Sequence, residues 1–396
     1  MNIVIVGNGI AGLSAAEEIR KKDTSSTIHM ITDESYYTYY RTRLSHYLAQ
    51  DFETEDVYVH PKTWYEENNI NVIFEQKVEQ IDPDKKIVTL SDSEALYYNK
   101  LILANGSSSF MPPVEGKEKE GVFSLRSLDD VFAIQKYAKN VNKAIVVGGG
   151  LLGLETANAL NKRGLKVTVV EFAPRLLPRQ MDEEGSEVVA NIVRSQGVDL
   201  YVGAQVEKIL GEDVASGCQL KDGRQIEAPL ILFSAGVRSN VSLAKQMDLS
   251  VDRAVIVDEY MRTSAEDVYA VGDVAEFKGM SFNIWPIAIE QGKIAGRHIV
   301  GDEQAYEAIT PSNMLNILDI KAFSIGDIGS EDKAYQTLVD KEEQKLRKFF
   351  FSNNKLVGAI LINDIKLATK LKNKIDKDYT DVLRSTLSDH EKIEKL

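Results

Sequence analysis

Short apolar runs alternate along the chain with segments whose apolar residues recur at helical spacing. The first apolar run, Asn2–Val6, is closed by Gly7, and a helical pattern follows over residues 13–21. A second apolar run then covers residues 27–32. A strand, a glycine turn, a helix and a second strand in this order predict a βαβ unit.

The same order of elements recurs later in the chain. Residues 144–147 are typical of a strand, residues 154–163 of a helix, and residues 166–170 of a second strand. Two βαβ units predict an α/β protein in which the chain uses the same local structure twice.

Each unit carries three glycines between its first strand and its helix. Glycines at the end of a strand allow a tight turn, and the helix that starts there directs backbone N–H groups and its positive dipole end at bound phosphates. The flanking strands and helices make this signal more specific than glycine spacing alone, and it predicts two dinucleotide sites. The residues concerned are Gly7, Gly9, Ile10, Ala11 and Gly12, and Gly148, Gly150, Leu151, Leu152 and Gly153.

An acid at the end of the second strand of such a unit accepts hydrogen bonds from a ribose. In the later unit this acid is Glu171, about 20 residues after the glycines. Its carboxylate repels a 2′-phosphate, so we expect this site to prefer NADH to NADPH. Nearby Arg175 is expected to face either solvent or the pyrophosphate. In the first unit, Asp33 or Glu34 is expected to contact the ribose of an adenosine.

Further apolar runs predict the rest of these domains. We expect strands, a helix that begins at Trp285, and a crossover linker rich in proline and glycine. The strands are residues 98–104, 230–235 and 267–271, the helix is residues 285–300, and the linker is residues 107–121.

The pattern changes from about residue 310. Residues 345–351 and 355–362 flank a Ser-Asn-Asn turn and predict a β-hairpin. Residues 367–375 predict an amphipathic helix. The tail, residues 389–396, is charged and is expected to fray.

Composition limits the classes of function. Domains average roughly 150 residues, so 396 residues predict two or three of them. The net charge of -13 argues against a nucleic acid or an anionic membrane as partner, because both need clustered positive charge. The sequence shows no membrane span and no basic leader of a secretory signal, so we expect a cytoplasmic protein. The single cysteine, Cys218, cannot form an internal disulfide or a cysteine-rich metal site.

Beyond the two glycine turns, the segment 32–45 (Thr-Asp-Glu-Ser-Tyr-Tyr-Thr-Tyr-Tyr-Arg-Thr-Arg-Leu-Ser) and the stretch Asp267-Val-Tyr-Ala-Val-Gly-Asp273 carry a resemblance. Over roughly residues 1–310 the chain resembles the pyridine nucleotide-disulphide reductase superfamily. Within it, the chain is most similar to NADH:rubredoxin reductases of the clostridial type and to the flavin module of NADH-dependent nitrite reductases.

The resemblance implies an α/β fold with two Rossmann-like domains, one for FAD and one for NAD, and a small α+β C-terminal domain. The implied FAD domain is discontinuous. Its segments are residues 1–108 and 238–309, with the NAD domain at 109–237 and an interface domain at 310–396.

The resemblance also implies roles for individual residues of the FAD site. Asp273 would bind the ribityl chain, the backbone of Val78 would hold the adenine, and the helix at Trp285 would face the flavin's pyrimidine edge. A helix N-terminus there would stabilise negative charge on the reduced flavin. The remaining FAD contacts would be Arg41, Thr42, His46, Arg126 and the sequence Ala104-Asn105-Gly106, in which Asn105 replaces the family's usual threonine.

Two residues are implied in catalysis. Glu155 matches a carboxylate that the family places near the flavin and nicotinamide, often beside a lysine. His46 stands at the position of that lysine, and it either pairs with Glu155 and titrates near neutral pH or is a surface or core histidine without a role.

The missing cysteines decide among the family's reactions. Relatives that reduce disulfides or peroxides use cysteines near the flavin, and residues 33–45 contain none. Cys218 precedes the Asp222-Gly223 turn and is expected to be a structural strand residue. The resemblance therefore implies hydride transfer from NADH to FAD, followed by single-electron transfer to a small iron protein such as rubredoxin.

Two alternatives stay open at this stage. One is an NADH oxidase or the flavin subunit of a nitrite reductase, which would need a partner that carries iron. The other is a redox-sensing flavoprotein that turns over slowly. An acidic rubredoxin would need a local positive surface on this acidic chain, and the candidates are Arg41, Arg43 and His46, or Lys366, Lys370, Lys372 and Lys374.

Overall fold

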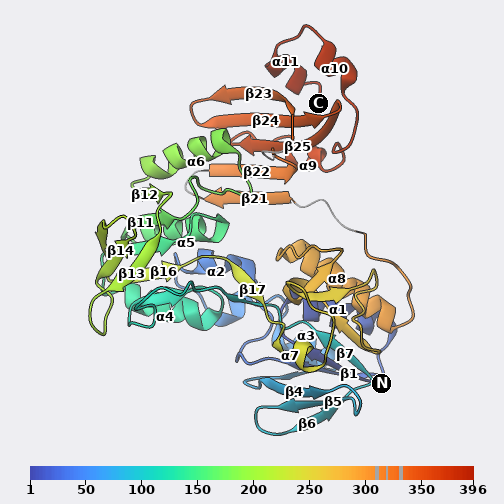
Figure 1. The fold of residues 1–396 in the computed structure, drawn as a ribbon. Coiled ribbons are helices and arrows are strands. Elements are labelled where there is room, and N and C mark those ends of the chain that lie inside the picture. The colour runs from blue at the N-terminus through green and yellow to red at the C-terminus, as the bar shows by residue number, and fades with distance from the viewer. Residues whose placement is uncertain (308–311, 318–319, 330–332) are drawn as a thin grey trace. The chain divides into compact units, whose positions relative to one another are not determined.

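The computed structural model describes residues 1–307, 312–317, 320–329 and 333–396 (Figure 1). The chain divides into two compact units. The first unit consists of Met1–Arg43, Phe52–Ser109 and Gly236–Ile309, and the second of Leu44–Asp51, Phe110–Ala235 and Thr310–Leu396. The boundary that the sequence predicts at residue 310 lies outside the described residues.

The first unit is built on a parallel sheet in the order β19-β7-β1-β2-β3. Branched apolar side chains favour strands, and a strand buried on both faces has an apolar run rather than an alternating pattern. The strands are β1 (Asn2–Val6), β2 (Thr27–Ile31), β3 (Ile70–Ile73), β7 (Lys100–Leu103) and β19 (Val268–Ala270). Their carboxyl ends meet at one edge of the sheet, where the first glycine turn lies.

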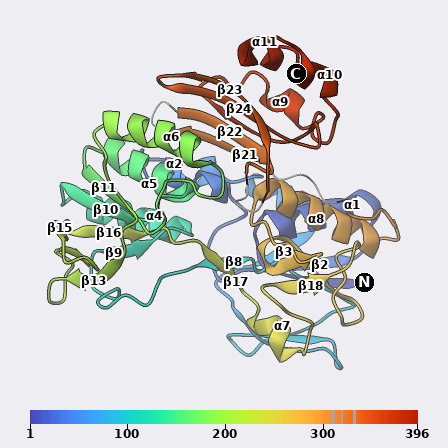
Figure 2. The ribbon, with the colours of Figure 1, turned by 45° about the horizontal axis from the view of Figure 1, so that its top comes forward.

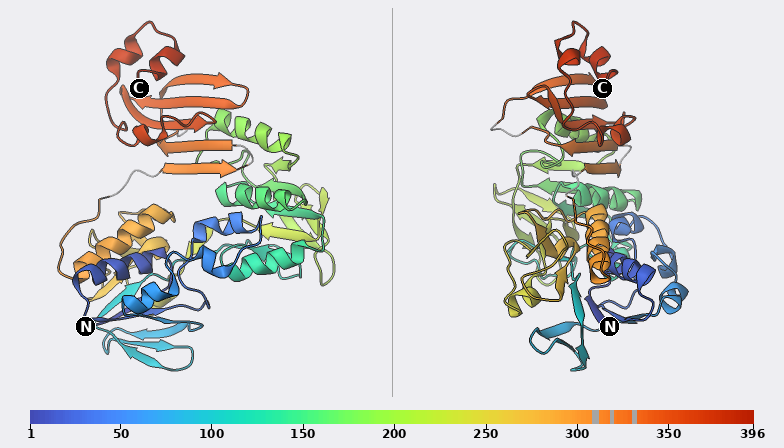
Figure 3. Two further views of the ribbon diagram at one scale, coloured as in Figure 1. Left: turned by 180° about the vertical axis from the view of Figure 1, so that it is seen from behind. Right: turned by 90° about the vertical axis from the view of Figure 1, so that its right-hand side faces the viewer.

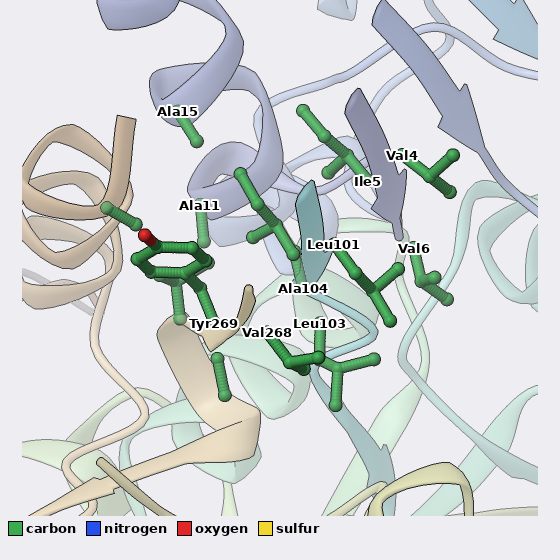
Figure 4. Close-up of a cluster of buried hydrophobic side chains, with 14 of the residues drawn as sticks. Val4, Ile5, Val6, Ala11, Ala15, Leu101, Leu103, Ala104, Val268 and Tyr269 are labelled. Carbon is green, nitrogen blue, oxygen red and sulfur yellow. The ribbon is translucent and has the colours of Figure 1, made fainter. Parts of the chain in front are cut away.

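Two helices cover this sheet side by side, α1 (Ile10–Lys22) and α8 (Trp285–Ile299), as the right panel of Figure 3 shows. Their backbones approach closely because Gly296 has no side chain: a Cβ there would lie 2.5 Å from the carbonyl oxygen of Ala15. Figure 4 shows the core beneath α1, where Ala11 and Ala15 lie over the side of the sheet that carries Ile5 and Tyr269, while Val4 lies on its other side. Because these helix side chains are small, α1 packs closely against the sheet.

The other elements of the first unit lie around this core. A small antiparallel sheet is formed by β4, β5 and β6, and β8 pairs with β17, so the predicted linker begins as a strand. The bounds are η1 (Arg41–Arg43), η2 (Thr54–Val57), α3 (Lys62–Glu67), β4 (Val78–Asp82), β5 (Ile87–Leu90), β6 (Ala95–Tyr97), β8 (Ser107–Ser109), β17 (Val237–Ser239), α7 (Ser242–Gln246), β18 (Val255–Val257), η3 (Gly272–Val274) and β20 (Ala275–Phe277).

The second unit repeats the parallel architecture, in the order β12-β11-β10-β16-β9 (Figure 2). A three-stranded antiparallel sheet, β13-β14-β15, accompanies it. The bounds are α2 (Leu44–Tyr47), β9 (Val122–Ser124), α4 (Leu128–Ala138), β10 (Lys143–Val147), α5 (Leu151–Lys162), β11 (Lys166–Glu171), α6 (Glu183–Ser195), β12 (Asp199–Val202), β13 (Val206–Leu210), β14 (Gly217–Leu220), β15 (Gln225–Glu227) and β16 (Leu230–Phe233).

The chain ends in an antiparallel sheet, in the order β21-β22-β25-β24-β23. The predicted hairpin is confirmed as β24 and β25. The bounds are β21 (Ser312–Ile317), β22 (Ile320–Gly326), β23 (Gln336–Glu342), β24 (Lys345–Ser352), β25 (Lys355–Ile362), α9 (Ala368–Leu371), α10 (Thr380–Arg384) and α11 (Asp389–Ile393).

Two predictions for this end of the chain were wrong. The helix expected over residues 367–375 is only one turn long, α9, because the following segment turns back to hydrogen-bond with β25. The tail does not fray: Ser388 and Glu391 form a capping box at the start of α11, and Ile393 and Leu396 are buried in the C-terminal core.

The α/β fold class with a C-terminal domain is confirmed. In the described part of the chain, no helix is both long and apolar enough to cross a membrane, and no group of three or more histidine, cysteine, aspartate or glutamate residues is placed to hold a metal ion.

Candidate dinucleotide-binding sites

The first glycine turn is held closed by two glycines. Gly7 has a φ of 112°, which favours glycine, and a Cβ there would overlap the carbonyl of Ala104. A Cβ on Gly12 would overlap the carbonyl of Gly7 itself. Gly9, by contrast, faces open space, with no atom within 4 Å of where its Cβ would lie. The turn thus leaves room over Gly9, at the N-terminus of α1, of the kind that a pyrophosphate needs.

The second glycine turn has the same geometry. Gly148 has a φ of 124°, and a Cβ there would overlap the carbonyl of Ser234. A Cβ on Gly153 would overlap the carbonyl of Gly148, whereas nothing lies within 4 Å of a Cβ on Gly150. The helix that follows, α5, begins at Leu151, so Leu151 and Leu152 occupy its first turn. The second unit therefore also has open space over the middle of its glycine turn, at a helix N-terminus.

The acid of the first site is positioned by two partners. After β2, Glu34 accepts a hydrogen bond from the hydroxyl of Tyr39 at 2.6 Å and one from the guanidinium of Arg41 at 2.7 Å. Asp33, the other candidate, is exposed. Of the two acids that the sequence left open, the geometry favours Glu34 as the ribose ligand.

One polar atom of the first site has no protein partner. Asn105 donates through its side-chain N–H to the carbonyl of Asn240 at 2.9 Å, but its Oδ1 is buried and accepts no hydrogen bond from the residues that the structure describes. Close by in the fold, Ser107 donates to the Oδ2 of Asp273 at 2.6 Å. Buried carbonyl groups are rarely left unpaired, so Asn105 fits a site that a polar ligand completes.

An aromatic stack marks the start of α8. The ring of Trp285 stacks on Tyr40 with centroids 6.0 Å apart, and the guanidinium of Arg43 lies 4.6 Å above the Tyr40 ring.

The remaining residues implied in the first site lie on several elements. Thr42, in η1, is exposed, and Val78, at the start of β4, is buried in the core of this unit. Ile10 and Ala11 form the first turn of α1.

The acid of the second site is held by backbone groups. The N–H of Gly149 donates to one carboxylate oxygen of Glu171, and the N–H of Ala173 donates to the other at 2.6 Å. A Cβ on Gly149 would lie 3.1 Å from that carboxylate and 2.6 Å from the side chain of Leu176. Glycine is therefore needed between the two outer glycines for Glu171 to reach the turn.

Glu155 lies one helical turn after the start of α5, and its partner is Ser45. The serine hydroxyl donates to Glu155 Oε2 at 2.7 Å. Burial raises the pKa of Glu155, and the hydrogen bond from Ser45 lowers it only in part. Of the two alternatives that the sequence left open for His46, the structure does not show the pairing with Glu155: His46 is exposed and packs edge-on against Tyr47, with centroids 6.3 Å apart. The neighbouring position in α2 points at α5, and Ser45 occupies it.

The chain matches two family models. The pyridine nucleotide-disulphide oxidoreductase model covers residues 1–292, and the rubredoxin NAD+ reductase C-terminal domain model covers residues 311–379. The chain belongs to the pyridine nucleotide-disulphide oxidoreductase family. The resemblance seen in the sequence is thereby confirmed.

Individual relatives are similar over nearly the whole chain. An NADH-rubredoxin oxidoreductase of Clostridium acetobutylicum is 34% identical over 94% of this chain and 94% of its own length. A nitrite reductase of Bacillus subtilis is 35% identical over 95% of this chain, but the chain spans only 47% of that protein. The crystal structure of the clostridial enzyme superposes with a TM-score of 0.87 at 32% identity, covering 100% of this chain and 99% of the other.

The cysteine of this family member is placed for packing. Cys218 is fully buried in β14, and burial raises the pKa of its thiol to about 11. A thiol in that environment stays protonated and unreactive near neutral pH. The structure supports the structural role that the sequence predicts for Cys218.

Arg126, the FAD contact implied by the resemblance, precedes α4, where its backbone N–H donates to Asp130 at 2.7 Å.

Sequence reasoning missed several residues of these sites. Asn8 donates to the carbonyl of Tyr36 at 2.9 Å and accepts from the hydroxyl of Thr38, and so ties the first turn to the next segment. Ser45, and not its neighbour His46, is the partner of Glu155. Phe172, next to Glu171, is 74% exposed. Only Phe172 had a visible signal, because an aromatic residue beside a ribose acid can stack on adenine.

Proposed function

We propose that the chain is an NADH:rubredoxin oxidoreductase that binds FAD in its first unit and NADH in its second. The observation that carries the proposal is that two open glycine turns occur in a chain whose only cysteine is fully buried. When bound, FAD accepts a hydride and releases electrons one at a time. Because its only cysteine is buried, the chain offers no reactive thiol to receive a pair of electrons, so the reduced flavin would pass its electrons to an external acceptor, for which we propose a one-electron carrier.

The residues of the chain bind and orient the two nucleotides. The turn at Gly9 and the acid Glu34 would hold the pyrophosphate and adenosine of FAD, and the free Oδ1 of Asn105 and the carboxylate of Asp273 would hold its ribityl part. The turn at Gly150 and Glu171 would hold NADH. Because Glu171 is anionic, a 2′-phosphate would be repelled, which favours NADH over NADPH.

The choice of acceptor rests on similarity to rubredoxin reductases. The C-terminal domain matches the model of the rubredoxin NAD+ reductase C-terminal domain, and the clostridial relative of similar length is named for this reaction. Rubredoxin or a similar small iron protein is therefore the proposed partner.

A second candidate function is the flavin module of a nitrite reductase, favoured by the 35% identity to the Bacillus subtilis enzyme. An NADH oxidase is a further possibility within the same chemistry, and a sensor that turns over slowly is the alternative outside catalysis. These alternatives differ in what reoxidises the reduced flavin.

The test is an anaerobic stopped-flow experiment on the FAD-loaded protein. Reduction of the flavin by NADH is followed first, with NADPH as the control. Oxidised rubredoxin or air is then mixed with the reduced protein in separate runs. Fast reoxidation by rubredoxin and slow reoxidation by air is the expected result. Fast reaction with air alone would make the protein an oxidase, and a reduced protein that neither oxidises would favour the nitrite reductase module or the sensor.

A further inference from the structure

One charged side chain of the second site has no protein partner. Arg175 follows Glu171 by four residues and is half-buried, and its Nε is buried and donates to no acceptor in the described part of the chain. A guanidinium is charged at every relevant pH, and a buried charged donor without an acceptor is costly. Native structures seldom leave such a group unsatisfied unless a ligand completes it.

The segment that carries Arg175 lies against the second glycine turn. The backbone N–H of Leu177 donates to the carbonyl of Gly149 at 3.0 Å, and the side chain of Leu176 is the nearest neighbour of Gly149, 2.6 Å from where a Cβ would lie. Arg175 immediately precedes these two leucines. Its backbone is thereby fixed beside the turn whose next residue, Gly150, faces open space.

Glu171, the carboxylate nearest in sequence, is not a partner of Arg175 in the described part of the chain. Both carboxylate oxygens of Glu171 accept backbone N–H groups, from Gly149 and from Ala173. Arg175 forms no ion pair with Glu171, although only three residues separate them in the sequence. A cation beside an anion-binding turn and without a carboxylate of its own is placed to receive an external anion.

We propose that Arg175 donates hydrogen bonds to a phosphate group of the bound pyridine nucleotide. The inference rests on the proposed function, in that it takes the second unit to be the NADH site. The phosphate has two sources: the pyrophosphate, common to NADH and NADPH, and the 2′-phosphate, present only in NADPH. The guanidinium fork suits either, because it can donate two parallel hydrogen bonds to one phosphate.

Ligand fragments separate these sources. ADP-ribose carries the pyrophosphate without a 2′-phosphate, 2′-AMP carries the 2′-phosphate without a pyrophosphate, and adenosine carries neither. The affinity of each is measured by calorimetry on the FAD-loaded protein, for the wild type and for Arg175→Met and Arg175→Lys. This readout is binding, and it does not depend on turnover.

The matched control is Arg194→Met. Arg194 is exposed in the last turn of α6, which leads to the start of β12, so it lies toward the amino ends of the strands. The glycine turn lies at the carboxyl ends, the opposite edge of the sheet. Arg194→Met therefore removes the same charge from the same unit without touching the site.

The expected result is that Arg175→Met weakens ADP-ribose about tenfold to a hundredfold, the range for losing a hydrogen bond to a charged group, and leaves adenosine unchanged. Arg175→Lys should fall in between, because it keeps the charge and loses the fork. Affinity for ADP-ribose should also become less sensitive to salt in Arg175→Met. A loss confined to 2′-AMP would equally support a phosphate contact and assign it to the 2′-phosphate.

Several results would overturn the inference. One is unchanged binding of both ADP-ribose and 2′-AMP by an Arg175→Met protein that keeps its flavin and its melting temperature. Equal weakening of adenosine and ADP-ribose in both Arg175 variants would also overturn it, since it would show a local structural role. Wild-type protein that takes up FAD but binds no ADP-ribose would overturn both this inference and the proposed NADH site.

Discussion

The two glycine turns of the chain share their outer geometry and differ in the residue between the first two glycines. In both, the first glycine has a positive φ and packs on the neighbouring strand, and the third packs on the first. The residue between is Asn8 in the first unit and Gly149 in the second. The residue at this position determines which neighbouring groups contact each turn.

Asn8 attaches the first turn to the segment that follows β2. Its side chain bridges the carbonyl of Tyr36 and the hydroxyl of Thr38, and that segment continues to Tyr39 and Arg41, the partners of Glu34. Residues 36–41 thus bond to the turn through Asn8 and to the acid through Tyr39 and Arg41. Satisfied polar contacts of this kind rigidify a site, which suits the proposed binding of a cofactor that remains bound.

Gly149 instead lets side chains approach the second turn from outside. Glu171 receives its backbone N–H, and Leu176 covers it. No side chain from the turn itself holds the acid, and the buried Nε of Arg175 beside it has no acceptor among the described residues. The two turns therefore share one backbone motif and differ in how each is attached to its surroundings, which fits the proposal that the first holds a retained dinucleotide and the second an exchanging one.

The largest expected effect comes from Gly12→Val and Gly153→Val. In each variant the new Cβ would overlap the carbonyl of the first glycine, so the turn must open. Overpacking against backbone costs about 1–3 kcal/mol or more and misplaces the phosphate-binding N–H groups. Gly12→Val should be purified without flavin, whereas Gly153→Val should keep its flavin and lose NADH binding.

Flavin absorbance per protein and calorimetric titration with NADH check this pair, and each variant is the control for the other. If Gly153→Val lost its flavin as readily as Gly12→Val, the two sites would not be independent and the comparison would fail.

Local structure around these turns could be predicted from the sequence because it depends on local interactions. The first strand is found where it was predicted, Asn2–Val6, and both glycine-turn helices are present. Each helix begins three residues earlier than the apolar pattern indicated, because the last residues of the glycine motif already adopt helical geometry. The sequence pattern assigned these residues to the glycine turn, whereas their backbone already belongs to the helix.

Contacts between distant segments could not be predicted in this way. Ser45 and Glu155 are 110 positions apart, and no local pattern reveals that Ser45 rather than His46 faces α5. The order at the tail depends likewise on the burial of Ile393 and Leu396 in the C-terminal core. In both cases the structure depends on contacts with distant residues, which the polarity of the local sequence does not reveal.

The next largest effect is expected for Asn8→Ala. The substitution leaves the buried hydroxyl of Thr38 and the carbonyl of Tyr36 without this partner, at a cost of about 1–3 kcal/mol. FAD affinity should fall by roughly tenfold, the equivalent of about 1.4 kcal/mol, while NADH still reduces the flavin that remains. Equilibrium dialysis of the flavin measures the change, and unchanged FAD affinity would show that the network does not hold the site.

A smaller effect is expected when the second turn is given the residue of the first, in Gly149→Asn. The new Cβ would meet the end of the Leu176 side chain at 2.6 Å, which can move, and would crowd Glu171. We expect NADH affinity to fall by about fivefold, since the cost of displacing one flexible side chain is about 1 kcal/mol. FAD content should not change. Tighter NADH binding in this variant would contradict the view that the second turn needs glycine between its outer glycines.

The smallest effect is a pH dependence of the stability of the second unit, carried by Glu155. Burial raises the pKa of this carboxyl from its ordinary value of 4.5, so the folded protein favours the protonated form. Below that value both folded and unfolded chains hold the proton, and Glu155 costs nothing. As the pH rises through the two pKa values, the folded protein loses stability relative to the unfolded chain.

Glu155→Gln removes this loss and keeps an acceptor for the hydroxyl of Ser45. Its melting temperature relative to wild type should therefore rise between pH 4.5 and pH 8, when both are measured by differential scanning fluorimetry. Glu187→Gln, an exposed position on α6, is the matched control. A difference between Glu155→Gln and wild type that stayed constant or shrank over this range would mean that Glu155 is ionised in the folded protein, paired there with a cation or with water.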